Sequence, residues 1–193
     1  MERPNEINSN KNKGFFAKYW WVVLLVCLLG FAAYFAAVRI LTSAGGGDTF
    51  GKDHPIPEGL EYELPKEADD PVEYIIDTFL TSNYLQVWNG IQGGVYQYWF
   101  SYPALPDGEV FLRCYEVTEN IELSASRLRE ASTVAVKDHT DFGLIADKQQ
   151  FTLYEGDWGD YYAARIEVWH KDANTGAETK LLEKVFRVEG WMR

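Results

Sequence analysis

Residues 161–188 read YYAARIEVWHKDANTGAETKLLEKVFRV, and this stretch decides the fold class. In its first part, from Tyr162 to Val168, apolar residues alternate with charged ones. A period of two residues is typical of a strand with one buried face. The turn-forming residues 172–176, DANTG, separate this part from a second apolar run at residues 181–188. The stretch therefore predicts two antiparallel strands joined as a hairpin.

Charge pairing predicts the register of this hairpin. If the numbers of paired residues sum to 354, Glu167 faces Arg187 and Arg165 faces Glu189, so that opposite charges meet. A sum of 350 would set Glu167 against Glu183, and like charges directly opposite each other are destabilising. We therefore expect the register with the sum of 354.

The chain from residue 84 onward repeats the strand pattern in shorter runs. Apolar and aromatic runs bounded by turn residues predict further strands over residues 84–88, 95–102, 110–117, 133–136 and 151–154. Seven or so short strands with turns between them predict two packed antiparallel sheets. The fold class expected for this part is a mainly β, antiparallel β-sandwich with one or two short helices.

Three further segments carry less regular patterns. Residues 60–64 read LEYEL and predict a strand that begins near Leu60. Residues 71–80 follow a capping sequence, Asp70-Pro71-Val72-Glu73, and space their apolar residues as one helix face, which predicts a short helix with a strand as the alternative. Residues 124–130 predict a helical turn.

An apolar run near the N-terminus predicts a membrane anchor. Residues 19–38, YWWVVLLVCLLGFAAYFAAV, carry no charge, and as a helix at 1.5 Å per residue they would be about 30 Å long, the thickness of a bilayer core. Lys18 and Arg39 flank the run. A cleaved signal peptide is the alternative, but its apolar core spans only about 7–15 residues. We therefore expect an uncleaved signal-anchor, a single transmembrane helix over residues 19–41 that has the lipid bilayer as its partner.

The basic residues predict the orientation of the anchor. Four precede the run, Arg3, Lys11, Lys13 and Lys18, whereas Arg39 and Lys52 follow it. Because Lys and Arg are retained on the cytoplasmic side, residues 1–18 form a cytoplasmic tail and the C-terminal part lies outside, periplasmic or extracellular. Residues 42–59 are rich in glycine and proline and predict a flexible linker, followed by the extracytoplasmic β-sandwich domain at residues 60–193.

The charge balance argues against nucleic acid as a partner. Residues 1–47 carry five basic and two acidic side chains, a net charge of +3, and residues 48–193 carry thirteen basic and twenty-seven acidic, a net charge of −14. The total is −11. An acidic domain of this kind repels phosphate backbones, whose binding depends on Lys and Arg.

The sequence carries no nucleophile elbow, phosphate loop or metal-binding helix. We expect no cofactor and no enzymatic activity, and Cys114 is expected to be a small buried hydrophobe. Glu155, Asp157 and Asp160 share one glycine-containing loop, which makes them a weak calcium candidate, and a polar turn between strands explains them equally well.

Aromatic residues are the remaining candidates for a binding site. Trp158 and Tyr161 lie in the same loop, where a large ring either folds back on the core or meets a ligand. Tyr96 and Tyr98 share one face of the run at residues 95–102, and Trp99 lies on the other. These rings either bind a ligand such as a glycan or belong to the core, since strands favour aromatics in any case.

These observations together predict a membrane-anchored binding or scaffolding module with an envelope protein as its partner. The alternative is a carbohydrate-binding β-sandwich that uses its exposed aromatics, and an enzyme with paired carboxylates is the least favoured reading.

Overall fold

The computed structural model describes Val22, residues 24–31, Tyr34, and residues 49–67 and 83–191. It divides the chain into two units, Met1–Gly47 and Asp48–Arg193. In the first unit the described residues are helical. Within the parts of the chain that are described, no helix is both long and apolar enough to span a membrane. The expected tail at residues 1–18, most of the expected span at residues 19–41 and the expected helix at residues 71–80 lie outside the described residues.

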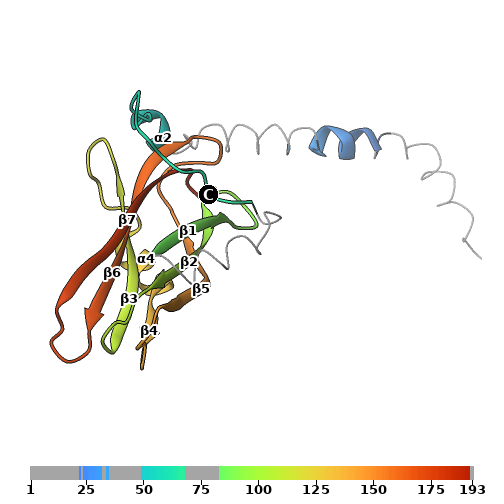
Figure 1. Cartoon of the computed structure of the whole chain (residues 1–193). Helices are drawn as coiled ribbons and strands as arrows, with labels where there is room; N and C mark the ends of the chain where they lie inside the picture. Colours follow the sequence, from blue (N-terminus) through green and yellow to red (C-terminus); the bar gives the residue numbers. More distant parts are fainter. Residues whose placement is uncertain (1–21, 23, 32–33, 35–48, 68–82, 192–193) are drawn as a thin grey trace, which may run out of the picture. The chain divides into compact units, whose positions relative to one another are not determined.

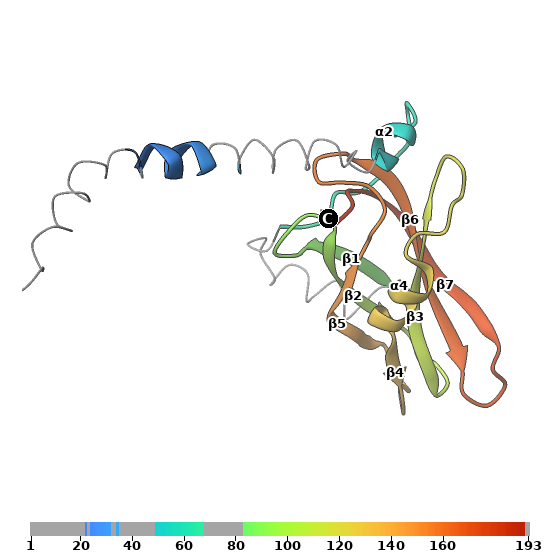
Figure 2. The ribbon, with the colours of Figure 1, turned by 180° about the vertical axis from the view of Figure 1, so that it is seen from behind.

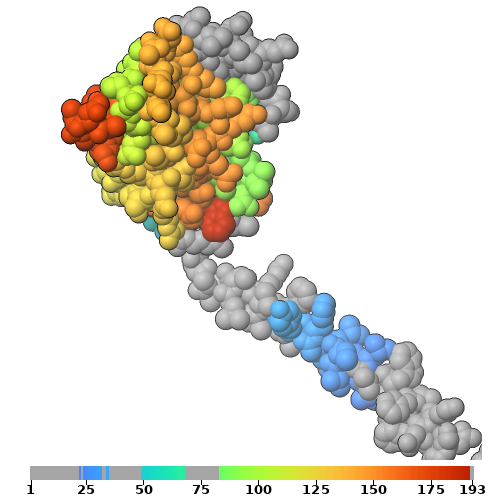
Figure 3. Space-filling view, turned by 90° about the horizontal axis from the view of Figure 1, so that it is seen from below, coloured from blue at the N-terminus to red at the C-terminus, as the bar shows by residue number. Residues whose placement is uncertain are grey.

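The second unit is mainly β and consists of two antiparallel sheets with few short helices (Figures 1 and 2). The three-stranded sheet has the order β1-β2-β5, with strands Tyr84–Asn89, Val95–Tyr102 and Gly143–Thr152. The four-stranded sheet has the order β4-β3-β6-β7, with strands Val134–Val136, Gly108–Glu116, Tyr162–Asp172 and Glu178–Val188. Helix α2 (Phe50–Asp53) precedes the sheets. Helix α4 (Ala125–Ser132) lies beside β5, as Figure 3 shows in yellow and orange. The expected antiparallel sandwich is thus confirmed at the level of its two sheets.

The core lies between the sheets and contains side chains from both. Tyr96, Tyr98 and Phe100 of β2 point inward and pack with residues of β3, β6 and β7. The buried hydroxyl of Tyr98 donates a hydrogen bond of 2.6 Å to the carbonyl oxygen of Ser132. The Ser132 hydroxyl in turn accepts 2.9 Å from the backbone N–H of Leu112. These polar groups of the core are thus paired, and an unpaired buried donor would cost about 1–3 kcal/mol.

Strand β5 is longer than the sequence pattern indicates. The sequence predicts a strand over residues 151–154 only, whereas β5 covers Gly143–Thr152. Its middle carries exposed polar residues, and its pairing with β2 is irregular near Lys148, whose φ of 52° interrupts regular strand geometry. An edge strand with a bulge lacks the apolar alternation that marks half-buried strands.

The segment near Leu60 connects the two sheets, although it is not the strand we expected. The backbone N–H of Glu63 donates to the carbonyl of Val185 in β7 (2.8 Å), and the N–H of Lys66 donates to the carbonyl of Val87 in β1 (2.8 Å). Each contact is an isolated parallel bridge. Pro65 lies between them and has no N–H to continue a ladder.

The register predicted for the β6–β7 hairpin is wrong. Glu167 faces Glu183, and Ile166 faces Lys184, so the paired numbers sum to 350. Next to the turn the paired numbers sum to 349, and a bulge between Val168 and Trp169 shifts the sum to 350 over the rest of the hairpin. The turn itself is short and hydrogen-bonded, because the carboxylate of Asp172 accepts 2.8 Å hydrogen bonds from the backbone N–H groups of Asn174 and Thr175. A register with the sum of 354 would lengthen the loop and lose this short turn, and turn geometry fixes hairpin register.

Neighbouring cations offset the repulsion that this register creates. The Nζ of Lys180 lies 2.7 Å from the Glu183 carboxylate and 3.3 Å from that of Glu167. Glu167 also accepts 2.9 Å hydrogen bonds from Arg165 Nε and Trp169 Nε1. Burial opposes ionisation of Glu167, but these hydrogen bonds outweigh it and hold the pKa of its carboxyl below the ordinary value. The diagonal neighbour Lys180 therefore compensates the repulsion between Glu167 and Glu183, which face each other directly.

Candidate functional site

The five aromatic residues singled out from the sequence do not form one surface. Tyr96 and Tyr98 are buried in the core, as the alternative interpretation predicted. Trp99 lies on the outer face of its sheet, where it is also buried and packs against Trp88 with ring centroids 5.4 Å apart. Trp158 and Tyr161 remain exposed, by 65% and 45%. These two rings belong to the loop that connects β5 to β6.

The exposed rings lie where several loops meet, a region we call the glycine-rich end (residues 90–94, 155–161 and 189–191). A Cβ atom on Gly94 would clash with the backbone of Trp191, and one on Gly190 would clash with the backbone of Glu155 and Gly156. The loops therefore pack backbone against backbone, which requires glycine. A Cβ atom on Gly93 would lie 2.6 Å from Cδ1 of Trp158, so that the β1–β2 turn supports one edge of the indole.

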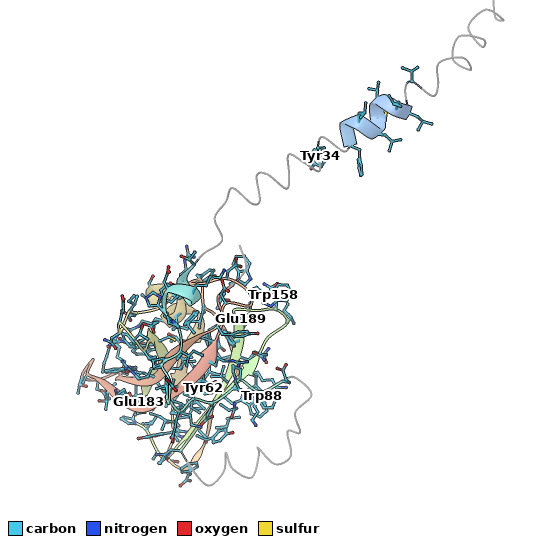
Figure 4. All side chains as sticks on the ribbon, turned by 90° about the horizontal axis from the view of Figure 1, so that it is seen from above. Tyr34, Tyr62, Trp88, Trp158, Glu183 and Glu189 are labelled. Atoms are coloured by element: carbon cyan, nitrogen blue, oxygen red, sulfur yellow. The ribbon has the colours of Figure 1, made fainter. Side chains whose placement is uncertain are left out.

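Glu189 holds the loops of this end together. Its carboxylate accepts a 2.7 Å hydrogen bond from the backbone N–H of Gly159. Its own N–H donates to the hydroxyl of Tyr96 (2.8 Å), which donates back to its carbonyl oxygen (3.1 Å). Burial raises the pKa of the Tyr96 hydroxyl, so this group stays protonated and able to donate. Figure 4 shows Glu189 and Trp158 at the same end of the domain. The ring of Tyr96 lies in the core, and its hydroxyl thus holds the backbone of Glu189 at this end of the domain.

A small pocket opens beside Tyr161. It measures about 130 Å³ and is lined by Leu64, Pro65, Glu67, Asn89, Tyr96, Tyr161, Arg187 and Glu189. The guanidinium of Arg187 lies over the ring of Tyr161, 4.6 Å from the centroid. Its buried Nε has no hydrogen-bond partner among the described residues. Sites for whole small molecules usually measure about 300–1,000 Å³, so this pocket has room for one functional group rather than a ligand.

Helix α2 attaches the start of the second unit to the glycine-rich end. The ring of Phe50 packs against the core, edge-on to Tyr162 with centroids 5.1 Å apart. The Nζ of Lys52 forms a 3.0 Å ion pair with Asp160, and this contact raises the pKa of Lys52. A Cβ atom on Gly51 would clash with the Asp160 backbone, so helix and loop touch directly.

The three carboxylates considered for calcium do not converge. The Glu155 carboxylate accepts hydrogen bonds from the backbone N–H (2.9 Å) and hydroxyl (2.7 Å) of Ser124. Asp157 accepts from the N–H of Trp158 (2.8 Å), and Asp160 pairs with Lys52. Across the described ranges no group of three or more potential metal ligands is present. Each of these carboxylates binds a different partner within the protein.

The three histidines and Cys114 have structural surroundings. His54, His139 and His170 each place a ring nitrogen 2.8–3.0 Å from a backbone carbonyl oxygen. Cys114 is fully buried in the core, and burial raises the pKa of its thiol well above the ordinary value. A thiol that stays protonated is a poor nucleophile.

The glycine-rich end therefore presents two exposed rings, Trp158 and Tyr161, with the charged groups of Arg187 and Glu189 in the pocket beside Tyr161. Sequence reasoning did not single out Ile91, which is 98% exposed in the β1–β2 turn, next to the turn-forming pair Asn89-Gly90. Comparison with models of protein families, with curated proteins and with solved structures finds no match in any of the three.

Proposed function

We propose that the chain is a membrane-anchored extracytoplasmic binding or scaffolding module. Residues 19–41 would form the anchor, residues 1–18 the cytoplasmic tail, and the β-sandwich the part that meets a partner outside the cytoplasm. The uncharged run and the four basic residues before it support this arrangement.

The observation that carries the proposal is the way in which the chain enters the sandwich. Phe50, only nine residues after the end of the expected anchor, already packs against the core. Lys52 then ties α2 to the glycine-rich end through Asp160. A domain attached through this end would leave the outer face of its four-stranded sheet to a partner.

The outer face of the four-stranded sheet is the surface we assign to that partner. Arg113 and Arg129 both reach Glu178, at 2.5 Å and 2.8 Å, and Glu167 and Lys180 continue the network across β6 and β7. Charges that are held in place before binding favour a partner of complementary pattern and guide its approach. An envelope protein fits such a face better than nucleic acid does, because the domain carries a net charge of −14.

Cysteine labelling tests the topology. In a Cys27→Ser background, single variants Asn174→Cys and Asn10→Cys are exposed to a membrane-impermeant maleimide on intact spheroplasts. We expect residue 174 to be labelled at once and residue 10 only after lysis. The reverse pattern, or protection of both sites until lysis, would overturn the proposed orientation.

Site-specific photo-crosslinking tests the partner surface. A photoreactive amino acid at Glu183, on the outer face, is compared with the same group at Asp147, which is exposed on β5 of the other sheet. We expect a discrete protein adduct from position 183 and none from position 147. Equal adducts from both positions, or none from position 183, would contradict the assignment.

A glycan-binding module is the second candidate, and the exposure of Trp158 and Tyr161 favours it. Flat rings with polar groups such as Asn89 and Glu67 nearby suit a sugar, which presents both apolar faces and hydroxyls. The detergent-solubilised chain should then sediment with insoluble envelope polysaccharide, and Trp158→Ala should abolish this. Tyr62→Ala, which removes another exposed ring, is the matched control. Equal sedimentation of the two variants would exclude Trp158 as a sugar-binding residue.

A further inference from the structure

Three large apolar side chains of the glycine-rich end face water. Ile91 is 98% exposed, Trp158 65% and Tyr161 45%. They belong to the same end of the domain, because Gly93, two residues after Ile91, lies against the indole of Trp158, and Tyr161 follows Trp158 in one loop. Leaving apolar area in water forgoes about 25 cal/mol per Å². Exposed apolar residues gathered at one end of a domain mark a contact site more often than scattered single residues do.

The start of the second unit limits what this surface can meet. Helix α2 touches the loop of Trp158, through the Lys52–Asp160 pair and the close approach of Gly51. Thr49 directly precedes α2, and the expected membrane span ends at residue 41. Eight backbone steps of at most about 3.6 Å each reach no further than about 29 Å. The attachment point beside Trp158 therefore stays within about 29 Å of the place where the chain leaves the bilayer.

We propose that the glycine-rich end rests on the bilayer surface and that Ile91, Trp158 and Tyr161 enter its headgroup layer. The proposal rests on the membrane anchor of the proposed function. Trp and Tyr favour this layer because their rings combine apolar area with a polar group. A short tether also makes the contact intramolecular, at an effective concentration in the millimolar range, so a weak affinity of each ring suffices.

The charges around the three residues favour a zwitterionic surface. The end contains four acids, Glu155, Asp157, Asp160 and Glu189, and two cations lie beside it, Lys52 and Arg187. Asp160 is paired with Lys52, and Glu189 is hydrogen-bonded to a backbone N–H. Counted with these two cations, the end carries a net charge of −2, and residues 48–193 as a whole carry −14. Anionic headgroups would repel the domain, and neutral ones would leave the rings to determine the contact.

Lipid-based fluorescence quenching of the full chain in phosphatidylcholine vesicles tests the proposal. One fluorophore is attached in turn to native Cys27, to Ile91→Cys, or to Asn174→Cys, the last two in a Cys27→Ser background. Cys114 is fully buried and remains unlabelled. Position 174 is the matched control, because it lies in the turn beyond the far end of β6, whose 11 residues span about 35 Å. Nitroxide groups placed near the headgroup or deep in the acyl chain serve as quenchers.

We expect headgroup quenchers to remove about half of the emission at position 91 and almost none at position 174, since only the former lies in the interface. Adding Trp158→Ser should reduce the quenching at position 91 about twofold or more, because the indole supplies most of the apolar contact. Replacing a third of the lipid by phosphatidylglycerol should reduce it as well.

Each failure has a separate signature. Loss of deep quenching at Cys27 would overturn the anchor of the proposed function, and the further inference with it. Quenching at Cys27 without quenching at position 91 would overturn the further inference alone, and would leave the end facing solvent, as a glycan-binding or protein-binding end requires. Equal quenching at positions 91 and 174 would also overturn it, because the domain would then have no preferred end.

Discussion

Replacing Glu167 by glutamine should destabilise the β-sandwich, although the two side chains have nearly the same shape. Glu167 is only 4% exposed and accepts hydrogen bonds from Arg165, Trp169 and Lys180. Glutamine keeps the bond from Trp169 but loses the charge that binds the two cations. Hydrogen bonds to charged groups contribute about 1.5–3 kcal/mol each. Arg165 and Lys180 are partly exposed and regain water, and the repulsion from Glu183 disappears, so we expect a net loss of about 2 kcal/mol.

Thermal unfolding of the detergent-solubilised chain, followed by near-ultraviolet circular dichroism, measures this loss. About 2 kcal/mol corresponds to a decrease in Tm of roughly 4–8 °C for a domain of this size. Glu183→Gln is the matched control. Its side chain is about half exposed, and its ion pair with Lys180 is worth no more than about 1 kcal/mol. A Glu167→Gln protein as stable as the wild type, or a Glu183→Gln protein destabilised as much, would refute the account of the network.

The pH dependence follows from the lowered pKa of Glu167. A carboxyl whose pKa is lower in the folded state stabilises the fold above its unfolded pKa of about 4.3. That contribution decreases as the pH falls from this value through the folded pKa. The difference in Tm between the wild type and Glu167→Gln should therefore be full at pH 7 and diminish below about pH 4. A difference that grew on acidification would contradict the direction of the shift.

Three further predictions concern the core and the attachment of α2. Phe50→Ala should lower the free energy of unfolding by about 1–3 kcal/mol, measured by thermal unfolding, because the ring is partly buried against Tyr162. Ser132→Ala should cost about 1–3 kcal/mol and speed hydrogen exchange at Leu112, whose buried N–H would lose its acceptor. The Cys114 thiol should resist maleimide in the folded protein and react once denaturant unfolds the domain, and rapid labelling in the folded state would contradict its burial.

The two-residue period was sufficient to locate most strands. The run at residues 95–102 was predicted from its aromatics, and β2 covers Val95–Tyr102. Its parity was informative as well, since Tyr96 and Tyr98 share the face that became the core. Local alternation works here because one face of each strand is buried and the other is not.

The two-residue alternation does not predict the register of a hairpin or the position of an edge strand. Charges on directly opposite residues do not decide the register, because Lys180 bridges Glu167 and Glu183 from a diagonal position. Cross-strand pairs contribute only about 0.2–1 kcal/mol each, whereas the short Asp172 turn and the bulge between Val168 and Trp169 together give the observed register. Strand β5 was largely missed because its exposed polar residues carry no apolar period, and its place at the edge depends on pairing with β2.

The exposure of Trp158 was the least predictable feature of the candidate site. A ring at the tip of a loop folds back only if the domain leaves space for it. Here the turn at Gly93 already lies against the indole, and the Glu189 carboxylate, thirty residues away in the chain, holds the N–H of Gly159. Contacts between loops that are distant in sequence thus keep the Trp158 ring exposed to solvent. The residues next to Trp158 in the sequence do not predict these contacts. Helix α2 contacts the same loop at Asp160, so the position of the exposed ring arises only once the whole sandwich has assembled.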